Sequence, residues 1–115
     1  MASAAEKILL AGFGTTLGQQ GALFFRVGID LGEINLLALL PPYNEFLGFK
    51  ARDVVREMFR QDLVHLVEVG REYSPVIYAH AKSDKAAQKI TLFFDTLNPD
   101  ELDILPEHVV RAWWD

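Results

Sequence analysis

The sequence predicts an α+β fold, in which an N-terminal, a central and a C-terminal helix pack on an antiparallel sheet of four to five strands. Segments with apolar residues at helical spacing and segments of strand length follow one another along the chain. This order, with polar turns between strand segments, is typical of helices on an antiparallel sheet. The 115 residues, half of them hydrophobic, suffice for one core, so we expect a single domain over residues 1–115.

The first predicted element is a helix over residues 4–17. Ser3 and Glu6 have the spacing of a capping box, and the apolar residues that follow repeat at i, i+4 and i+8. Glycines in the same stretch disfavour a helix. A strand over residues 7–12 is therefore the alternative.

Two strands are predicted next, over residues 22–29 and 34–40. The four residues 30–33 between them have the composition of a tight turn. Both strands are mostly apolar on both faces, which indicates that helices cover one face and more protein covers the other. A proline pair ends the second strand, and residues 41–49 follow as an aromatic loop.

Residues 50–61 form a predicted helix, but residues 63–69 either extend it or form a strand, since periodicity alone does not decide. In the helical alternative, Asp62 lies in the apolar stripe, where burial raises its pKa, and His65 at i+3 is its partner. Such a pair could act as general acid and base. In the strand alternative, Asp62 lies in a connection, which also explains why an acid interrupts the stripe.

The next predicted elements are a turn over residues 70–75 and strands over 76–81 and 89–97. The polar residues 82–85 connect these two strands. In the second strand, apolar residues at alternate positions indicate one buried face.

The C-terminal segment is predicted to be helical. Asn98 and Pro99 have the pattern of a helix start, with Asn as the cap and Pro at the first helical position. A second proline breaks this segment, so the last helix is expected over residues 106–114. Helical neighbours point in different directions, so one of Trp113 and Trp114 should dock on the sheet, and the other should be partly exposed or covered by a second subunit.

The candidates for chemistry beyond Asp62 and His65 are few. His80 lies beside Tyr78 on the same side of its predicted strand and could face a pocket. The three histidines have no local metal-binding spacing, and the chain has no cysteine. We therefore expect neither a metal site nor a cofactor.

The charge balance restricts the partners. Lys and Arg number 11 against 16 Asp and Glu, which gives a formal net charge of −5. This disfavours nucleic acid and anionic membranes, because both need a basic footprint. No signal peptide or spanning segment is recognised, so we expect a cytoplasmic protein. Residues 95–107 carry five acids and no base, a patch that could meet a basic protein.

These observations favour a small acidic protein-interaction domain without catalytic activity, and a homodimer. The apolar strand faces and the aromatic residues need a covering partner, and the interface candidates are Tyr43, Phe46, Phe49, Trp113 and Trp114. At the level of architecture only, the element order resembles that of small dimeric secretion chaperones, and the size and charge resemble those of small immunity proteins.

The alternative function is a small-molecule-binding protein or modest enzyme. It would have an apolar pocket between sheet and helices that uses Asp62, His65 and either Tyr78 or His80.

Overall fold

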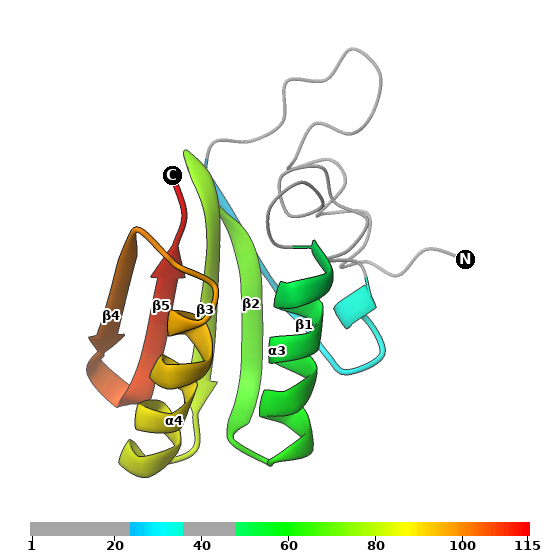
Figure 1. The fold of residues 1–115 in the computed structure, drawn as a ribbon, viewed down its shortest axis with the longest axis vertical. Helices are drawn as coiled ribbons and strands as arrows, with labels where there is room; N and C mark the ends of the chain where they lie inside the picture. Colours follow the sequence, from blue (N-terminus) through cyan, green and yellow to red (C-terminus); the bar gives the residue numbers. More distant parts are fainter. Residues whose placement is uncertain (1–23, 36–47) are drawn as a thin grey trace.

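The computed structural model describes residues 24–35 and 48–115. Five strands form an antiparallel sheet in the order β1-β2-β3-β5-β4 (Figure 1). The predicted α+β class and antiparallel sheet are therefore confirmed. In chain order the elements are β1 (Phe24–Ile29), α3 (Gly48–Arg60), β2 (Val64–Glu72), β3 (Ser74–Ala81), α4 (Asp84–Asp95), β4 (Glu101–Leu105), the short 3-10 helix η2 (Pro106–His108) and β5 (Val109–Trp113).

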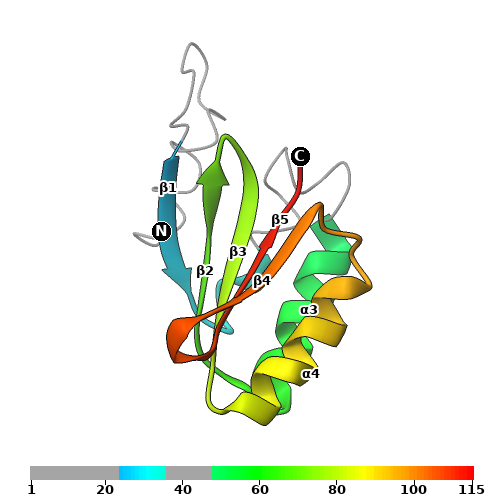
Figure 2. The same ribbon diagram turned by 90° about the vertical axis from the view of Figure 1, so that its left-hand side faces the viewer.

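The two helices α3 and α4 lie on the same face of the sheet, and the core is packed between them and the strands (Figure 2). Apolar residues reach this layer with helical spacing from the helices and with a period of two from the strands. The fully buried members include Ala51, Val55, Met58, Val67, Val69, Ile77, Ala79, Ile90, Phe94, Val110 and Ala112.

Helix α3 confirms the helix predicted over residues 50–61, and it ends before the disputed segment. Asp62 has a positive φ of 57°, which reverses the chain after the helix. The segment 63–69 is therefore strand, as β2 begins at Val64. The side chain of Asp62 is 81% exposed, so the helical alternative with a buried acid is wrong.

The first predicted strand is confirmed where it is described, as β1, and its turn follows with a hydrogen bond from Glu33 N to Asp30 O at 3.0 Å. Strand β1 pairs with β2, and the second strand does not begin at residue 34, because a 3-10 turn occupies residues 34–35. Residues 36–40, most of the loop predicted over 41–49 and the helix predicted over 4–17 lie outside the described residues. The last two residues of the predicted loop, 48 and 49, belong to α3, so the loop prediction is wrong there.

The turn predicted over residues 70–75 is wrong, because β2 and β3 continue through most of it. The chain reverses at Tyr73 alone, with a φ of 65°, and Glu72 already pairs with Ser74. The strand predicted over 76–81 is confirmed as part of β3.

The strand predicted over residues 89–97 is wrong, because α4 occupies most of this segment. Ser83 caps the helix by accepting a hydrogen bond from Ala86 N at 3.1 Å. Ile90 and Phe94 are buried at helical spacing, whereas Leu92 between them is 69% exposed. The alternation that indicated a strand is thus a coincidence of apolar residues on two sides of a helix.

The C-terminal helix predicted over residues 106–114 is also wrong, because β4 and β5 form a hairpin there. Asn98 has a φ of 52° and belongs to the turn after α4 rather than to a helix start. Pro106 begins the 3-10 turn between the two strands. The element order therefore differs from the one that carried the resemblance to secretion chaperones.

Candidate functional site

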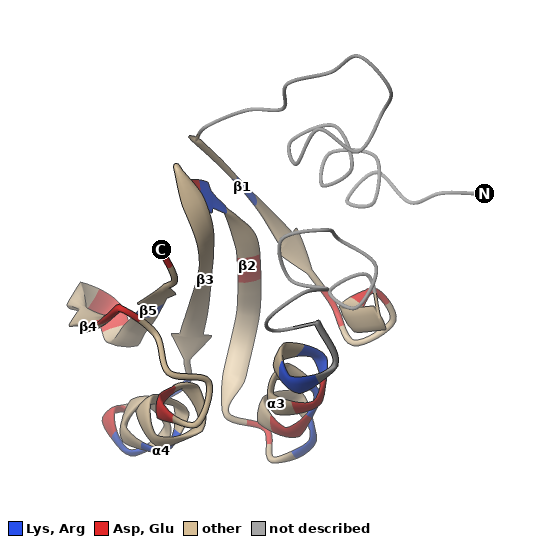
Figure 3. Cartoon of the chain, turned by 45° about the horizontal axis from the view of Figure 1, so that its top comes forward, with Lys and Arg blue, Asp and Glu red and all other residues tan. Residues whose placement is uncertain are grey.

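The candidate site is the sheet face opposite α3 and α4, which we call the polar face. Strand residues alternate between the two faces, so charged residues at alternate positions gather on one side. Figure 3 shows charged positions on the strands as well as on the helices. The register places one row across the sheet, in which Glu68 is opposite Tyr78, Tyr78 opposite Arg111, and Arg111 opposite Asp103.

Arg111 on β5 bonds three carboxylates of the polar face, and we call this group the Arg111 cluster. Its Nε and Nη2 donate to Glu72 Oε1 at 2.9 and 2.6 Å. Its Nη1 donates to Glu101 Oε1 at 2.8 Å and to Asp103 Oδ2 at 3.2 Å. Burial alone would lower the pKa of Arg111, but these bonds outweigh it and raise the pKa. The guanidinium is therefore a fixed, permanent cation.

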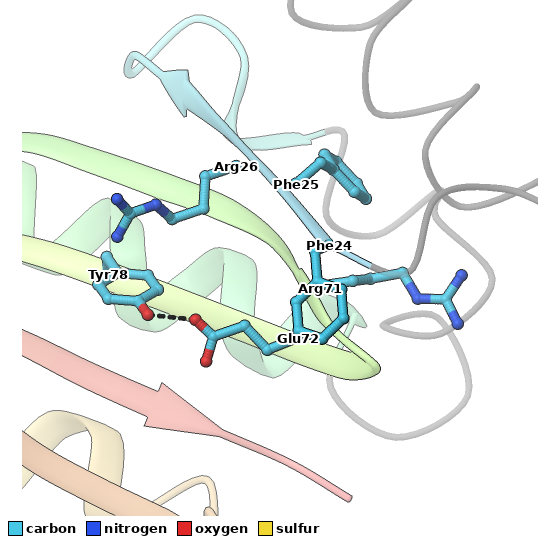
Figure 4. Close-up of a pocket in the computed structure, with 6 residues that line it drawn as sticks. All are labelled: Phe24, Phe25, Arg26, Arg71, Glu72 and Tyr78. Carbon is cyan, nitrogen blue, oxygen red and sulfur yellow. Dashed lines mark hydrogen bonds between the residues drawn. The ribbon is translucent and has the colours of Figure 1, made fainter.

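Tyr78 joins the Arg111 cluster to the middle of the face. Its hydroxyl donates to Glu72, and the Arg26 guanidinium lies 4.2 Å from the centre of its ring (Figure 4). Burial and the bond to Glu72 raise the pKa of Tyr78. Burial would raise the pKa of Glu72 as well, but the bonds from Tyr78 and Arg111 outweigh it and lower that pKa. Tyr78 therefore stays a neutral donor to a charged carboxylate.

His80 and Glu68 form a second polar contact on the same face. His80 Nε2 lies 2.5 Å from Glu68 Oε1, and Glu68 Oε2 lies 3.9 Å from Arg26 Nε. Both side chains are partly exposed. The sequence correctly placed His80 beside Tyr78 on one side of the strand, but it did not identify Glu68 as the partner.

A shallow hollow of about 380 Å³ lies at the end of the polar face where β1 meets the β2–β3 hairpin (Figure 4). Its lining mixes cations, a carboxylate and aromatic rings: Phe24, Phe25, Arg26, Arg71, Glu72 and Tyr78. Beside it, the exposed rings of Phe24 and Tyr73 contact edge to face, with centroids 4.5 Å apart. The hollow can hold a flat or charged group, but it does not enclose it.

The structure does not bring Asp62 and His65 into this site. Asp62 forms an ion pair with Lys82 in the connections at the far ends of α3 and β3. His65 is exposed at the irregular start of β2, where the register with β3 shifts. Only Tyr78 and His80 of the predicted polar candidates lie on the polar face.

The aromatic candidates are divided between faces. Trp113 lies on the polar face and donates from Nε1 to Glu72 O at 2.8 Å. Trp114 is in the core against Phe94, with ring centroids 6.3 Å apart. Phe49 lies in the first turn of α3. Tyr43 and Phe46 are outside the described residues.

Sequence reasoning missed Glu72, Arg111 and the role of Arg26. Glu68 and Glu72 are four residues apart, which puts them on one face once their segment is known to be a strand. Arg111 was not identified as a site residue because its segment was predicted to be helical. The available signal was the alternation of charged and apolar residues, not a motif.

No group of three His, Cys, Asp or Glu side chains that could hold a metal ion occurs among residues 24–35 and 48–115. In the same part of the chain, no helix is long and apolar enough to cross a membrane. Comparisons with protein-family models, curated proteins and solved structures find no match for this chain. Its function must therefore be inferred from its own residues.

Proposed function

We propose that this protein is a small cytoplasmic protein-interaction domain without catalytic activity, of a chaperone-, immunity- or adaptor-like kind. It contacts a basic protein partner through the polar face. One observation carries the proposal: Arg26, Arg111, Tyr78 and Trp113 are held side by side on one face by contacts with each other and with Glu72.

These residue types support protein recognition. Arg, Tyr and Trp are the side chains that contribute most to binding in protein interfaces. Side chains that are already fixed lose little conformational freedom when a partner binds, so more of the contact energy is left for affinity. Arg111 is only 15% exposed and bonds three acids, which makes it a rigid support for the residues around it.

The shape and charge of the face support the same proposal. The hollow is shallow, whereas small-molecule sites bury most of their ligand in a cleft. The carboxylates Glu68, Glu72, Glu101 and Asp103 outnumber the arginines Arg26 and Arg111 on this face. An excess of negative charge favours a basic partner and increases its rate of association.

Affinity capture from the source cells, followed by mass spectrometry, tests the proposal. Wild type, Tyr78→Phe and Arg26→Ala are compared with Asp62→Asn, a matched control whose side chain is away from the polar face. The expected result is a basic protein that wild type and the control enrich and that both polar-face variants lose. A partner retained equally by all four proteins, or no enriched partner, contradicts the proposal.

The second candidate function is the binding of a small ligand in the hollow. The observation that favours it is the volume of about 380 Å³ together with Arg26 and Tyr78 at its wall, where an anionic aromatic ligand would fit. Asp62 and His65, which the sequence-based prediction included, do not line this hollow. A thermal-shift screen of metabolites tests this second function, since a ligand at 100 times its Kd stabilises the folded protein by about 2.7 kcal/mol.

The homodimer is also a proposal. The exposed side chains of Phe24 and Leu92 support it. Analytical ultracentrifugation at tens of micromolar protein measures the mass of the species in solution directly. A monomer at that concentration contradicts the proposed homodimer.

A further inference from the structure

β4 forms one edge of the sheet (Figure 1). Within residues 24–35 and 48–115, its only strand neighbour is β5. An edge strand carries backbone N–H and C=O groups on its outer side that have no ladder partner, and these groups can pair with a strand of another chain. The outer side of β4 is therefore a surface on which a partner's backbone can dock.

The hydrogen bonds of β5 determine which residues of β4 face outward. Trp113 directs its carbonyl towards β4, where it accepts from Asp100 N at 2.9 Å. Trp114 directs its N–H towards β3, where Pro75 O accepts at 3.0 Å. The backbone groups of successive strand residues point to opposite sides. Both the N–H and the C=O of Trp113 therefore point towards β4, so Trp113 forms a hydrogen-bonded pair with the β4 residue directly opposite it.

That residue is Glu101, and the alternation then fixes the rest of β4. Glu101 and Asp103 direct their backbone groups inward to β5, whereas Leu102 and Ile104 direct theirs outward. The side chains alternate as well. Glu101 and Asp103 lie on the polar face, and Ile104, on the helix side, is 56% exposed. The edge thus combines unpaired backbone groups with carboxylates on one side and an apolar residue on the other.

The Arg111 cluster leaves this edge with uncompensated negative charge. One guanidinium serves the three carboxylates of Glu72, Glu101 and Asp103. The side chains of Glu101 and Asp103 are each 53% exposed, so a cation from outside can reach them. A docking strand with basic residues would complete the charge balance of the cluster.

We infer that an extended basic segment of the partner adds to β4 as a sixth strand. This inference rests on the proposed function, because the added strand extends the same polar face. The segment alternates Lys or Arg, which face Glu101 and Asp103, with apolar residues, which lie beside Leu102 and Ile104. Main-chain bonds to Leu102 and Ile104 supply affinity, and the alternation supplies specificity.

A second copy of this chain does not fit the same edge. Antiparallel pairing of β4 with itself around Asp103 sets that carboxylate opposite its own copy, and pairing around Leu102 sets Glu101 opposite Asp103. Like charges directly opposite each other are destabilising. Pairing around Ile104 sets Leu102 opposite Pro106, which has no N–H to donate.

The test uses a fluorescent peptide that alternates valine and lysine, titrated into the full chain and followed by anisotropy and by amide NMR shifts. The expected result is saturable binding that weakens with salt, with the largest shifts at Leu102 and Ile104. A peptide with glutamate in place of lysine should not bind. No binding of the lysine peptide at millimolar concentration, or shifts centred away from β4, overturns the inference.

Two variants separate the contributions of charge and backbone. Asp103→Asn should weaken the lysine peptide about threefold, while Asp95→Asn, the same change on α4 in the same acidic segment, should not. Ile104→Pro removes an outward N–H that β5 does not use, and it should abolish binding while the thermal melt confirms folding. Unchanged binding by Ile104→Pro overturns the inference. If that variant fails to fold, the comparison of Asp103→Asn with Asp95→Asn decides, and equal binding by these two variants overturns the inference.

The outcome for the edge can be distinguished from that for the polar face. If the captured partner is lost with Tyr78→Phe but retained by Ile104→Pro, the proposed function stands and strand addition is wrong. Self-association of the chain that Ile104→Pro abolishes also overturns the inference, because a second copy would then occupy the edge.

Discussion

Replacing Gly70 by Ala should separate β1 from β2 locally. Gly70 is paired with Arg26 across these strands, and an added Cβ would overlap the carbonyl oxygen of Phe25. It would also lie 2.8 Å from the Phe25 carbonyl carbon and 3.0 Å from Arg26 Cα. Carbon atoms prefer separations of about 3.5–4.0 Å, so the β1 backbone has to move by about 1 Å.

The loss in the free energy of unfolding follows from the contacts that such a shift breaks. A displacement of this size weakens about two backbone hydrogen bonds beside Gly70, each worth about 0.5–1.5 kcal/mol. It also loosens the packing of Val27 and Ile29 on the core. Alanine recovers about 0.5–1 kcal/mol through its lower backbone entropy. We expect a net loss of about 1–2 kcal/mol in the free energy of unfolding, measured by urea denaturation with tryptophan fluorescence.

Gly28→Ala is the matched control on the neighbouring strand. There the new Cβ would meet only Leu66 Cδ1 at 2.9 Å, the end of a flexible and partly exposed side chain that can rotate away. The free energy of unfolding should change by less than about 0.5 kcal/mol. If Gly70→Ala unfolds at the wild-type urea midpoint, or if both variants lose the same stability, the reasoning about backbone contact is wrong.

Three further outcomes are expected. Phe94→Ala should lower the free energy of unfolding by about 3–5 kcal/mol, because Phe94 is fully buried; Leu92→Ala, at an exposed position of the same helix, should change the urea midpoint little. Asp62→Asn should change stability by less than about 0.5 kcal/mol, because its ion pair is exposed; a large loss in the same assay would mean that the carboxylate is buried. The lowered pKa of Glu72 in the folded chain means that its stabilisation is present above the ordinary value of 4.5 and is lost as the pH falls through the folded pKa. Stability should therefore decline with acid below about pH 4.5, and less steeply in Glu72→Gln, when urea midpoints are compared across pH.

The elements that could be predicted are those whose signals are local. The helix near residues 50–61 has a complete apolar stripe and a wet side, so its own residues define it. The strand within 76–81 is a short apolar run that is buried on both faces as the central strand of the sheet. Neither prediction required knowledge of a distant segment.

The wrong predictions came from patterns that have two physical meanings. Asn98 followed by Pro99 is found at helix starts, but Asn with positive φ and a following Pro are equally typical of helix ends. Ser83 was the cap that would have identified α4, three residues before Ala86. Trp113 and Trp114 point to opposite faces, as neighbours in a strand do, whereas a helix would separate them by a smaller angle.

The site could be predicted only in part, because the pairing of the strands brings its residues together from distant parts of the sequence. Tyr78 and His80 share a face by their spacing alone. Arg111 reaches Tyr78 and Glu72 only because β5 lies beside β3, and 39 residues separate Glu72 from Arg111. Nothing in the local sequence around either residue specifies that neighbour.

The position of β5 between β3 and β4 has a consequence for synthesis on the ribosome. While the nascent chain is emerging, β1, β2 and β3 can pair as soon as they leave the exit tunnel, but β4 has no neighbour in the sheet until β5 has followed it. β4 can therefore join the sheet only together with β5 or after it, when α4 has already been made. Until then, the side of β3 that later holds β5 is exposed to other chains in the cell.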